Sequence, residues 1–160
     1  MATTTELKTG AKAPDFTLAD AAEQQVSLSD FAGKWLVLYF YPKDNTSGCT
    51  VEALDFTAAL PEFKKLNAAI VGVSPDSCAS HQKFISKHDL KVLLLSDESK
   101  QMLSAYGVWQ EKSMYGKKYL GVVRTTVLVD PQGVIRHIWP KVKVKGHADE
   151  VKETLKALQS

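Results

Sequence analysis

Cysteine is scarce in this 160-residue sequence, which contains only Cys49 and Cys78. Neither residue belongs to a Cys-x-x-Cys pattern, so the sequence argues against a disulfide-stabilised scaffold, a zinc site of paired cysteines and a thioredoxin-type dithiol. The four histidines are not spaced as metal ligands along any predicted helix or strand. We therefore expect no metal and no other cofactor, and thiols that stay reduced in the cytoplasm.

Long apolar runs and an excess of one charge are also absent. No stretch approaches the roughly 18 apolar residues that a membrane span needs, and the N-terminus lacks the basic start and apolar core of a signal peptide. Lysine and arginine number 20 against 18 aspartates and glutamates, which leaves a net charge of +2. This balance argues against nucleic acids and membrane surfaces as partners.

The length of the chain fits a single domain over 1–160, in which 1–13 are expected to form a flexible N-terminal arm. Three uninterrupted apolar runs, at 35–40, 68–73 and 93–95, predict buried strands. Helical patterns lie between them. This alternation predicts an α/β fold with a central mixed, mostly parallel sheet flanked by helices.

The C-terminal part of the sequence has a different pattern. Two runs rich in β-branched residues, at 122–129 and 134–139, flank the segment 130–133, whose proline and glycine positions predict a hairpin turn. The alternating lysines of 141–145 predict a protected edge strand. Residues 148–158 carry one apolar face and predict a closing helix.

Cys49 lies between the apolar run 35–40 and a helical pattern that begins near Thr50. Pro42 ends the strand because it cannot donate a ladder hydrogen bond, and Thr46 is a helix-capping residue type. A cysteine in the first turn of a helix meets unpaired backbone amides and the positive end of the helix dipole, which favour thiolate over thiol. The opposing interpretation is a buried, inert cysteine, which is common for this residue type.

The helix after Cys49 is expected to be amphipathic and interrupted. Apolar side chains recur along it at Val51, Leu54, Leu60 and Phe63. Pro61 is expected to divide the helix into two pieces, because a proline inside a helix removes a backbone hydrogen bond.

The motif Pro42-x-x-x-Thr46-x-x-Cys49 is similar to the active-site signature of the peroxiredoxins. Further segments resemble the bacterioferritin comigratory protein or peroxiredoxin Q subfamily, namely 71–77, 80–84, 114–118 and 124–126. This resemblance implies a thioredoxin-like fold and a thiol-dependent peroxidase that reduces hydrogen peroxide and organic hydroperoxides through a cysteine sulfenic acid. It also implies recycling by thioredoxin or another thiol, no metal, and a monomer, with a weak dimer as the alternative.

The resemblance assigns a role to each matching residue. Cys49 is the peroxidatic nucleophile, the Thr46 hydroxyl, the Cys49 backbone amide and the Arg124 guanidinium are donors to the peroxide, and Pro42 shields the thiolate from water. Such donors are needed, because lowering a thiol pKa from about 8.5 to about 6 gains roughly thirtyfold in thiolate but loses about tenfold in nucleophilicity. Without the resemblance, Arg124 is a solvent-facing strand residue and Thr46 a helix cap.

Both positions at which this subfamily commonly carries a second cysteine hold other residues, Leu54 and Ile85. Cys78 is therefore the candidate resolving residue, and both cysteines are expected at the C-terminal edge of the sheet. Resolution by Cys78 and resolution by an external thiol are both left open. Two other functions stay as alternatives to a peroxidase: a one-cysteine redox sensor or relay that passes oxidation to a partner protein, and a chaperone-like binder.

Overall fold

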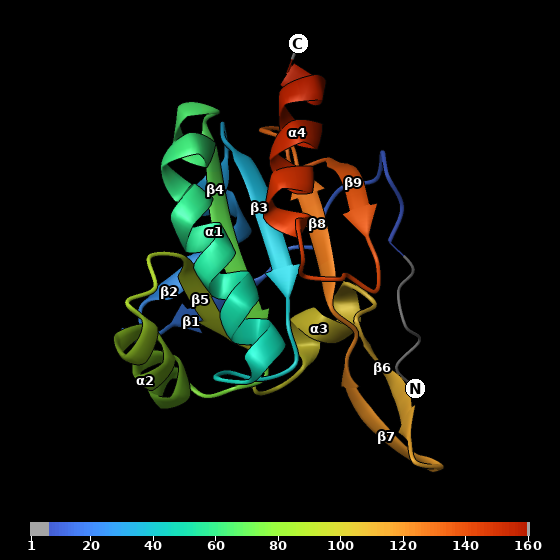
Figure 1. Ribbon diagram of the computed structural model, residues 1–160. Helices are drawn as coiled ribbons and strands as arrows, with labels where there is room; N and C mark the ends of the chain where they lie inside the picture. The colour runs from blue at the N-terminus through green and yellow to red at the C-terminus, as the bar shows by residue number, and fades with distance from the viewer. Residues whose placement is uncertain (1–6, 160) are drawn as a thin grey trace.

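Residues 7–159 are described by a computed structural model, in which a central sheet carries helices on both faces and a separate hairpin extends from it (Figure 1). The strands are β1 (Thr17–Asp20), β2 (Gln25–Ser27), β3 (Trp35–Phe40), β4 (Ala68–Ser74), β5 (Leu93–Ser96), β6 (Trp109–Met114), β7 (Lys117–Val122), β8 (Thr125–Val129) and β9 (Ile135–Trp139). The helices are α1 (Ser47–Lys65), α2 (Cys78–His88), α3 (Gln101–Ala105) and α4 (His147–Gln159), with a short 3-10 turn η1 at Leu28–Phe31.

The central sheet has seven strands in the order β2-β1-β5-β4-β3-β8-β9. The sheet is mixed, as the sequence predicted, but parallel pairing is confined to β3 with β4 and β4 with β5. The other pairings are antiparallel. The parallel part is therefore smaller than predicted, because the β1–β2 hairpin completes one edge of the sheet and the β8–β9 hairpin completes the other.

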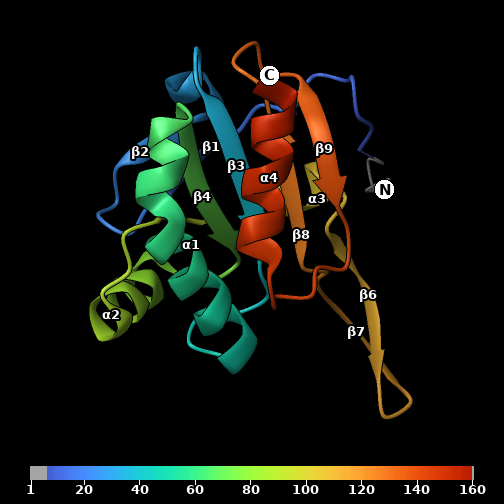
Figure 2. The ribbon, with the colours of Figure 1, turned by 45° about the horizontal axis from the view of Figure 1, so that its top comes forward.

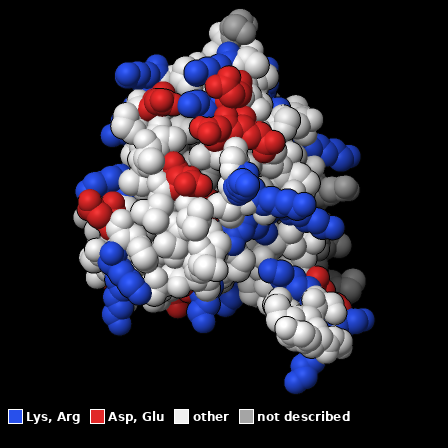
Figure 3. All heavy atoms as spheres, in the orientation of Figure 1, with Lys and Arg blue, Asp and Glu red and all other residues white. Residues whose placement is uncertain are grey.

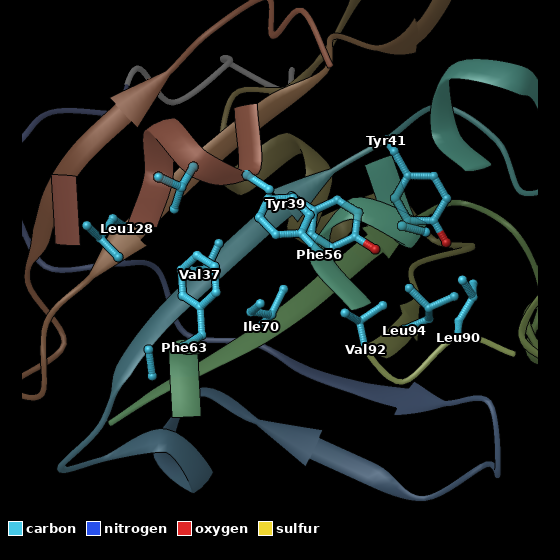
Figure 4. Close-up of a cluster of buried hydrophobic side chains, with 14 of the residues drawn as sticks. Val37, Tyr39, Tyr41, Phe56, Phe63, Ile70, Leu90, Val92, Leu94 and Leu128 are labelled. Atoms are coloured by element: carbon cyan, nitrogen blue, oxygen red, sulfur yellow. The ribbon is translucent and has the colours of Figure 1, made fainter. Parts of the chain in front are cut away.

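Strand β3 is buried along its whole length because its side chains alternate between two hydrophobic clusters. The odd-numbered residues face the cluster beneath α1, α2 and α4, where the Tyr39 ring stacks on Phe56 with centroids 4.9 Å apart (Figure 4). The even-numbered residues face the cluster that includes α3. Burial on both faces explains why an uninterrupted apolar run predicted this strand with its correct bounds.

Helix α1 begins at Ser47, close to the predicted start, but its course and its buried face differ from the prediction. Pro61 lies inside one continuous helix and does not divide it. Val51 and Leu54, predicted on the apolar face, are 48% and 40% exposed. The residues that α1 buries are Cys49, Glu52, Ala53, Phe56 and Phe63. The buried face therefore includes Cys49, Glu52 and two phenylalanines, and the Phe56 and Phe63 rings contact each other with centroids 6.3 Å apart.

Strands β6 and β7 form a two-stranded sheet that the sequence did not predict. They are joined by Tyr115 and Gly116, whose φ angles of 53° and 77° are both positive, as a tight two-residue hairpin turn requires. The hairpin extends away from the body of the protein (Figures 1 and 2). Neither strand buries a complete face, so no alternation of apolar and polar residues indicates it.

The predicted flexible arm 1–13 lies partly outside the structure, since 1–6 are not among the described residues. Within the remainder, the backbone amides of Gly10 and Ala13 donate hydrogen bonds of 2.8 and 2.9 Å to carbonyl groups at the start of β9 and in the turn before it. These hydrogen bonds place 10–13 beside the β8–β9 hairpin, and the flexibility of the arm stays a prediction.

The C-terminal segment contains one wrong and one confirmed prediction. Residues 141–145 do not form the predicted edge strand, because β9 ends at Trp139 and the chain then turns towards α4. The Val142 amide instead donates a 2.8 Å hydrogen bond to the Arg124 carbonyl. The predicted helix at 148–158 is confirmed as α4.

Candidate active site

The loop between β3 and α1 positions Cys49. Thr46 is the N-cap residue of α1, so Cys49 is the third residue of the helix. Asn45, just before the N-cap, has a left-handed backbone conformation with a φ of 61°. Cys49 is only 1% exposed, and its place in the first turn puts it where helical amides have no carbonyl partner within the helix. The structure therefore places Cys49 at the helix start that the sequence predicted.

Arg124 contacts the Cys49 sulfur, although 75 residues separate them along the chain. It lies between β7 and β8, where the predicted strand 122–129 is broken. Its Nη2 donates to Cys49 Sγ at 3.2 Å, and its Nη1 donates to Glu52 Oε1 at 2.6 Å. A Cβ on Gly48 would lie 3.2 Å from Nη2, so glycine at this position allows the guanidinium to come close. The alternative of a solvent-facing Arg124 is wrong, because its side chain is 17% exposed.

Glu52 is the residue of this site that sequence reasoning missed. Burial raises the pKa of Glu52 from 4.5 to about 7, and the Arg124 guanidinium opposes that rise. Burial alone would lower the pKa of Arg124. The neighbouring Glu52 and Cys49 side chains outweigh this effect of burial, so the pKa of Arg124 is raised above its ordinary value. One sequence signal was available, because Glu52 follows Cys49 by three residues and therefore lies on the same side of the helix.

Thr46 and Pro42 belong to the loop before Cys49. Thr46 occupies the predicted N-cap position, but its Oγ1 donates to the Lys43 carbonyl at 2.9 Å and makes no capping hydrogen bond. With its proton used in this way, the Thr46 oxygen faces other groups as an acceptor, which differs from the donor role that the resemblance implied. Pro42 is half-buried immediately after Tyr41.

Cys78 is the first residue of α2, whose N-cap Ser77 accepts a 3.1 Å hydrogen bond from the Ser80 amide. Helix α2 follows β4 and α1 follows β3, and these strands are parallel neighbours, so the two cysteines share the C-terminal edge of the sheet. Cys78 is half-buried, and both thiols are free. Among residues 7–159, no guanidinium is hydrogen-bonded to Cys78 as Arg124 is to Cys49.

The surface over the first half of α1 carries few charged side chains (Figure 3). Val51 and Leu54 are exposed there. Within 7–159, no group of three or more His, Cys, Asp or Glu side chains is arranged to hold a metal ion. No helix of the described chain is long and apolar enough to cross a membrane.

A comparison with protein families matches residues 9–138 to the AhpC/TSA family. The chain belongs to the AhpC/TSA family. Peroxiredoxin Bcp from Bacillus subtilis is 48% identical to this AhpC/TSA chain over 150 residues, which cover 94% of this chain and 96% of that protein. Peroxiredoxin Bcp from Escherichia coli is 41% identical over the same length, with the same two shares covered.

Solved structures of AhpC/TSA relatives have the same fold. Bacterioferritin comigratory protein from Xanthomonas campestris, described for its alkyl peroxide reduction activity, is 48% identical with a TM-score of 0.87, covering 91% of this chain and 92% of its own. A mutant of PrxQ from Xylella fastidiosa is 39% identical with a TM-score of 0.92, covering 96% and 98%. The predicted thioredoxin-like fold and the predicted peroxiredoxin subfamily are confirmed.

Proposed function

We propose that Cys49 is the peroxidatic residue of this AhpC/TSA chain, which is a thiol-dependent peroxidase. The observation that carries the proposal is the 3.2 Å contact between Arg124 Nη2 and Cys49 Sγ. A guanidinium stays charged in proteins and stabilises a neighbouring thiolate, which is the nucleophilic form of cysteine. The relatives named above support a peroxidase activity.

In the proposed reaction, the Cys49 thiolate attacks one oxygen of hydrogen peroxide or of an organic hydroperoxide. A sulfur–oxygen bond forms while the oxygen–oxygen bond breaks. The second oxygen leaves with the electron pair and takes a proton from solvent, which gives water or an alcohol. The cysteine is oxidised to a sulfenic acid and the peroxide is reduced.

The surrounding residues are proposed to stabilise charge that develops during this attack. Arg124 and the backbone amide of Cys49 donate to the peroxide oxygens, and a preorganised pair of donors acts most strongly in a buried site. The Thr46 oxygen accepts a hydrogen bond from the peroxide, because its own proton is donated within the loop. Glu52 holds Arg124 in orientation, and Pro42 shields the thiolate from water.

The sulfenic acid is proposed to be recycled by thioredoxin or another thiol. An attacking thiol forms a disulfide with Cys49 and releases water, and a second thiol then restores Cys49. We propose an external thiol as the first thiol, with Cys78 as the alternative, since its helix is hydrogen-bonded to the Cys49 loop through Ser80. A disulfide needs Cα atoms within about 7 Å, so we expect the start of α2 to open before the two sulfurs could join.

We further propose that the protein works in the cytoplasm as a monomer, with a weak dimer as the alternative. Two free thiols fit a reducing compartment. The proposed chemistry proceeds through cysteine alone and requires no metal or cofactor. Sedimentation of the reduced and the oxidised protein would distinguish a monomer from a dimer.

The test compares the parent with Cys49→Ser, and Cys78→Ser is the matched control. We expect peroxide turnover with thioredoxin or a small thiol to disappear in Cys49→Ser while the fold is retained. Mass measurement after one equivalent of peroxide would show a sulfenic acid, an internal disulfide or a linked dimer in the parent. Retained turnover in Cys49→Ser would contradict the proposal. Oxidation of Cys49 without turnover by any thiol would favour the redox sensor.

A further inference from the structure

A buried hydrogen-bond network joins the Cys49 loop to α2, and Asp44 lies at its centre. The Asp44 side chain is 3% exposed and the His81 side chain is fully buried. Asp44 Oδ2 lies 2.7 Å from His81 Nδ1 and accepts from the Ser80 hydroxyl at 2.8 Å. Asp44 Oδ1 accepts from the Tyr41 hydroxyl at 2.6 Å. The carboxylate therefore connects the end of β3, the loop and the first turn of α2.

Both ring nitrogens of His81 have a hydrogen-bond partner within the protein. Its Nε2 lies 2.9 Å from the Leu95 carbonyl oxygen, which can only accept, so Nε2 carries a proton. Its Nδ1 faces the Asp44 carboxyl group, which also accepts from the Tyr41 and Ser80 hydroxyl groups. The contact is therefore a buried hydrogen bond between an imidazole and a carboxyl group, away from solvent.

Two further hydrogen bonds connect the same loop to α2 and to the residues before it. The Asp44 amide donates to Asp76 Oδ2 at 2.8 Å, two residues before Cys78. At the far end of α2, His88 Nε2 lies 3.0 Å from the Asn45 side-chain oxygen. The loop is thus attached near both ends of the helix.

We propose that the Asp44–His81 pair is a positioning contact that holds the Cys49 loop against the start of α2. It thereby supports the reaction of Cys49 with peroxide and keeps Cys78 protected. His81 acts through Asp44, which precedes Cys49 by five residues. Removal of one partner leaves a buried polar group of the other without its hydrogen bond, so the loop and the helix start separate more easily when either is lost.

This inference rests on the proposed function only for its effect on Cys49, and the effect on Cys78 is measured independently. The experiment follows the rate at which a maleimide labels Cys78 in the reduced protein, by peptide mapping, in His81→Gln, Asp44→Asn and the double variant. Tyr106→Phe is the matched control. It removes a hydroxyl that donates to the Pro14 carbonyl at 2.7 Å in the other hydrophobic cluster, away from the network.

We expect Cys78 labelling to rise at least about tenfold in each single variant, which corresponds to about 1.4 kcal/mol. The double variant should label no faster than either single variant, because both remove one contact. Tyr106→Phe should not raise labelling beyond what its lower free energy of unfolding explains. The proposal would be overturned if the effects of the two single variants added up in the double variant. It would also be overturned if Tyr106→Phe labelled Cys78 as fast as the single variants at the same free energy of unfolding.

The second readout is the rate of Cys49 oxidation by hydrogen peroxide in a stopped-flow instrument. We expect it to fall about tenfold in His81→Gln, since a misplaced reacting group lowers rates strongly. A parent that does not react with peroxide would refute the proposed function and leave the labelling result intact. If the parent reacts with peroxide but the variants label Cys78 no faster than the parent does, this inference alone is refuted.

If a variant fails to fold, Tyr41→Phe replaces it, because this change removes one hydrogen bond from Asp44. It should change the labelling rate and the oxidation rate in the same directions by smaller factors. No change in either rate would overturn the proposal.

Discussion

Cys49 and Cys78 occupy similar positions in the fold but have different surroundings. Each lies in the first turn of a helix, and the strands that precede these helices are parallel neighbours. Cys49 is buried against a guanidinium, whereas Cys78 is half-buried at the start of α2. A helix N-terminus is therefore common to both thiols and does not by itself distinguish a reactive cysteine.

The difference between the two thiols comes from a distant part of the chain. Arg124 reaches Cys49 from the short connection between β7 and β8, where the chain is not part of a strand. The Glu52 carboxylate orients the guanidinium from within α1. Gly48 leaves the space for this contact. Tertiary structure thus adds the charge that the local helix start lacks.

Removal of Arg124 should make the surroundings of Cys49 resemble those of Cys78 and should have the largest effect. We expect Arg124→Ala to slow the oxidation of Cys49 by about 10² to 10³, the typical cost of losing one preorganised donor. Arg124→Lys should also be slow, because an ammonium group cannot reproduce the planar donors. Stopped-flow oxidation measures both, and a rate for Arg124→Ala within a few fold of the parent would contradict the role of Arg124.

The buried Glu52 carboxylate should give the Cys49 side of the molecule a pH dependence. The pKa of Glu52 is raised from 4.5 to about 7 by burial, so between these values the folded state keeps a proton that the unfolded state releases. The stability this contributes is fully present below pH 4.5 and is lost as pH rises through about 7, at a cost of about 3 kcal/mol in the free energy of unfolding.

Glu52→Gln should remove this part of the pH dependence. Urea denaturation across the same pH range measures the free energy of unfolding for the parent and the variant. Glu98→Gln is a suitable control, because Glu98 is exposed to solvent and outside the ion pair with Arg124. An identical slope in Glu52→Gln and the parent would show that Glu52 does not titrate in this range.

A side chain at Gly48 should disturb Cys49 without removing any charge. The Cβ of Gly48→Ala would lie 3.2 Å from Arg124 Nη2, so the guanidinium has to shift by a few tenths of an ångström. We expect peroxide oxidation to slow by about tenfold, because reaction rates depend steeply on the position of the donor. Ser47→Ala, at an exposed position one residue earlier, is the control, and equal rates in both variants would argue against this close contact.

Loss of Cys78 should have the smallest effect. We expect Cys78→Ser to turn over peroxide within about twofold of the parent, since a cysteine sulfenic acid can condense directly with an external thiol. Peptide mapping of the peroxide-treated parent then shows no Cys49–Cys78 disulfide. A large loss of turnover together with that disulfide would establish Cys78 as the resolving residue.

The elements that the sequence predicted best are those whose signals are local. Strands β3 and β4 are continuous apolar runs, and Cys49 lies at the predicted start of α1. Burial on both faces favours such uninterrupted apolar runs in central strands. Assignment of Arg124 needed the resemblance, because its own segment reads as an ordinary strand.

The failures of prediction have physical causes that the local sequence pattern does not show. The hairpin β6–β7 lacks a buried face, and 141–145 alternate like a strand but find no strand to pair with among the described residues. Val51 and Leu54 face solvent because Glu52 is turned inwards to Arg124. The residue type of Glu52 gives no signal of burial, and only its spacing of three residues from Cys49 indicates the side of the helix on which it lies.

The most direct test of the difference between the two thiols uses the two single-cysteine proteins, Cys78→Ser and Cys49→Ser. Stopped-flow oxidation by hydrogen peroxide gives the rate for each remaining thiol under identical conditions. Because Arg124 contacts only the Cys49 sulfur of the two, we predict that Cys49 reacts faster than Cys78 by at least about 10². Rates that agree within a few fold would contradict the conclusion that Arg124 makes Cys49 the reactive thiol.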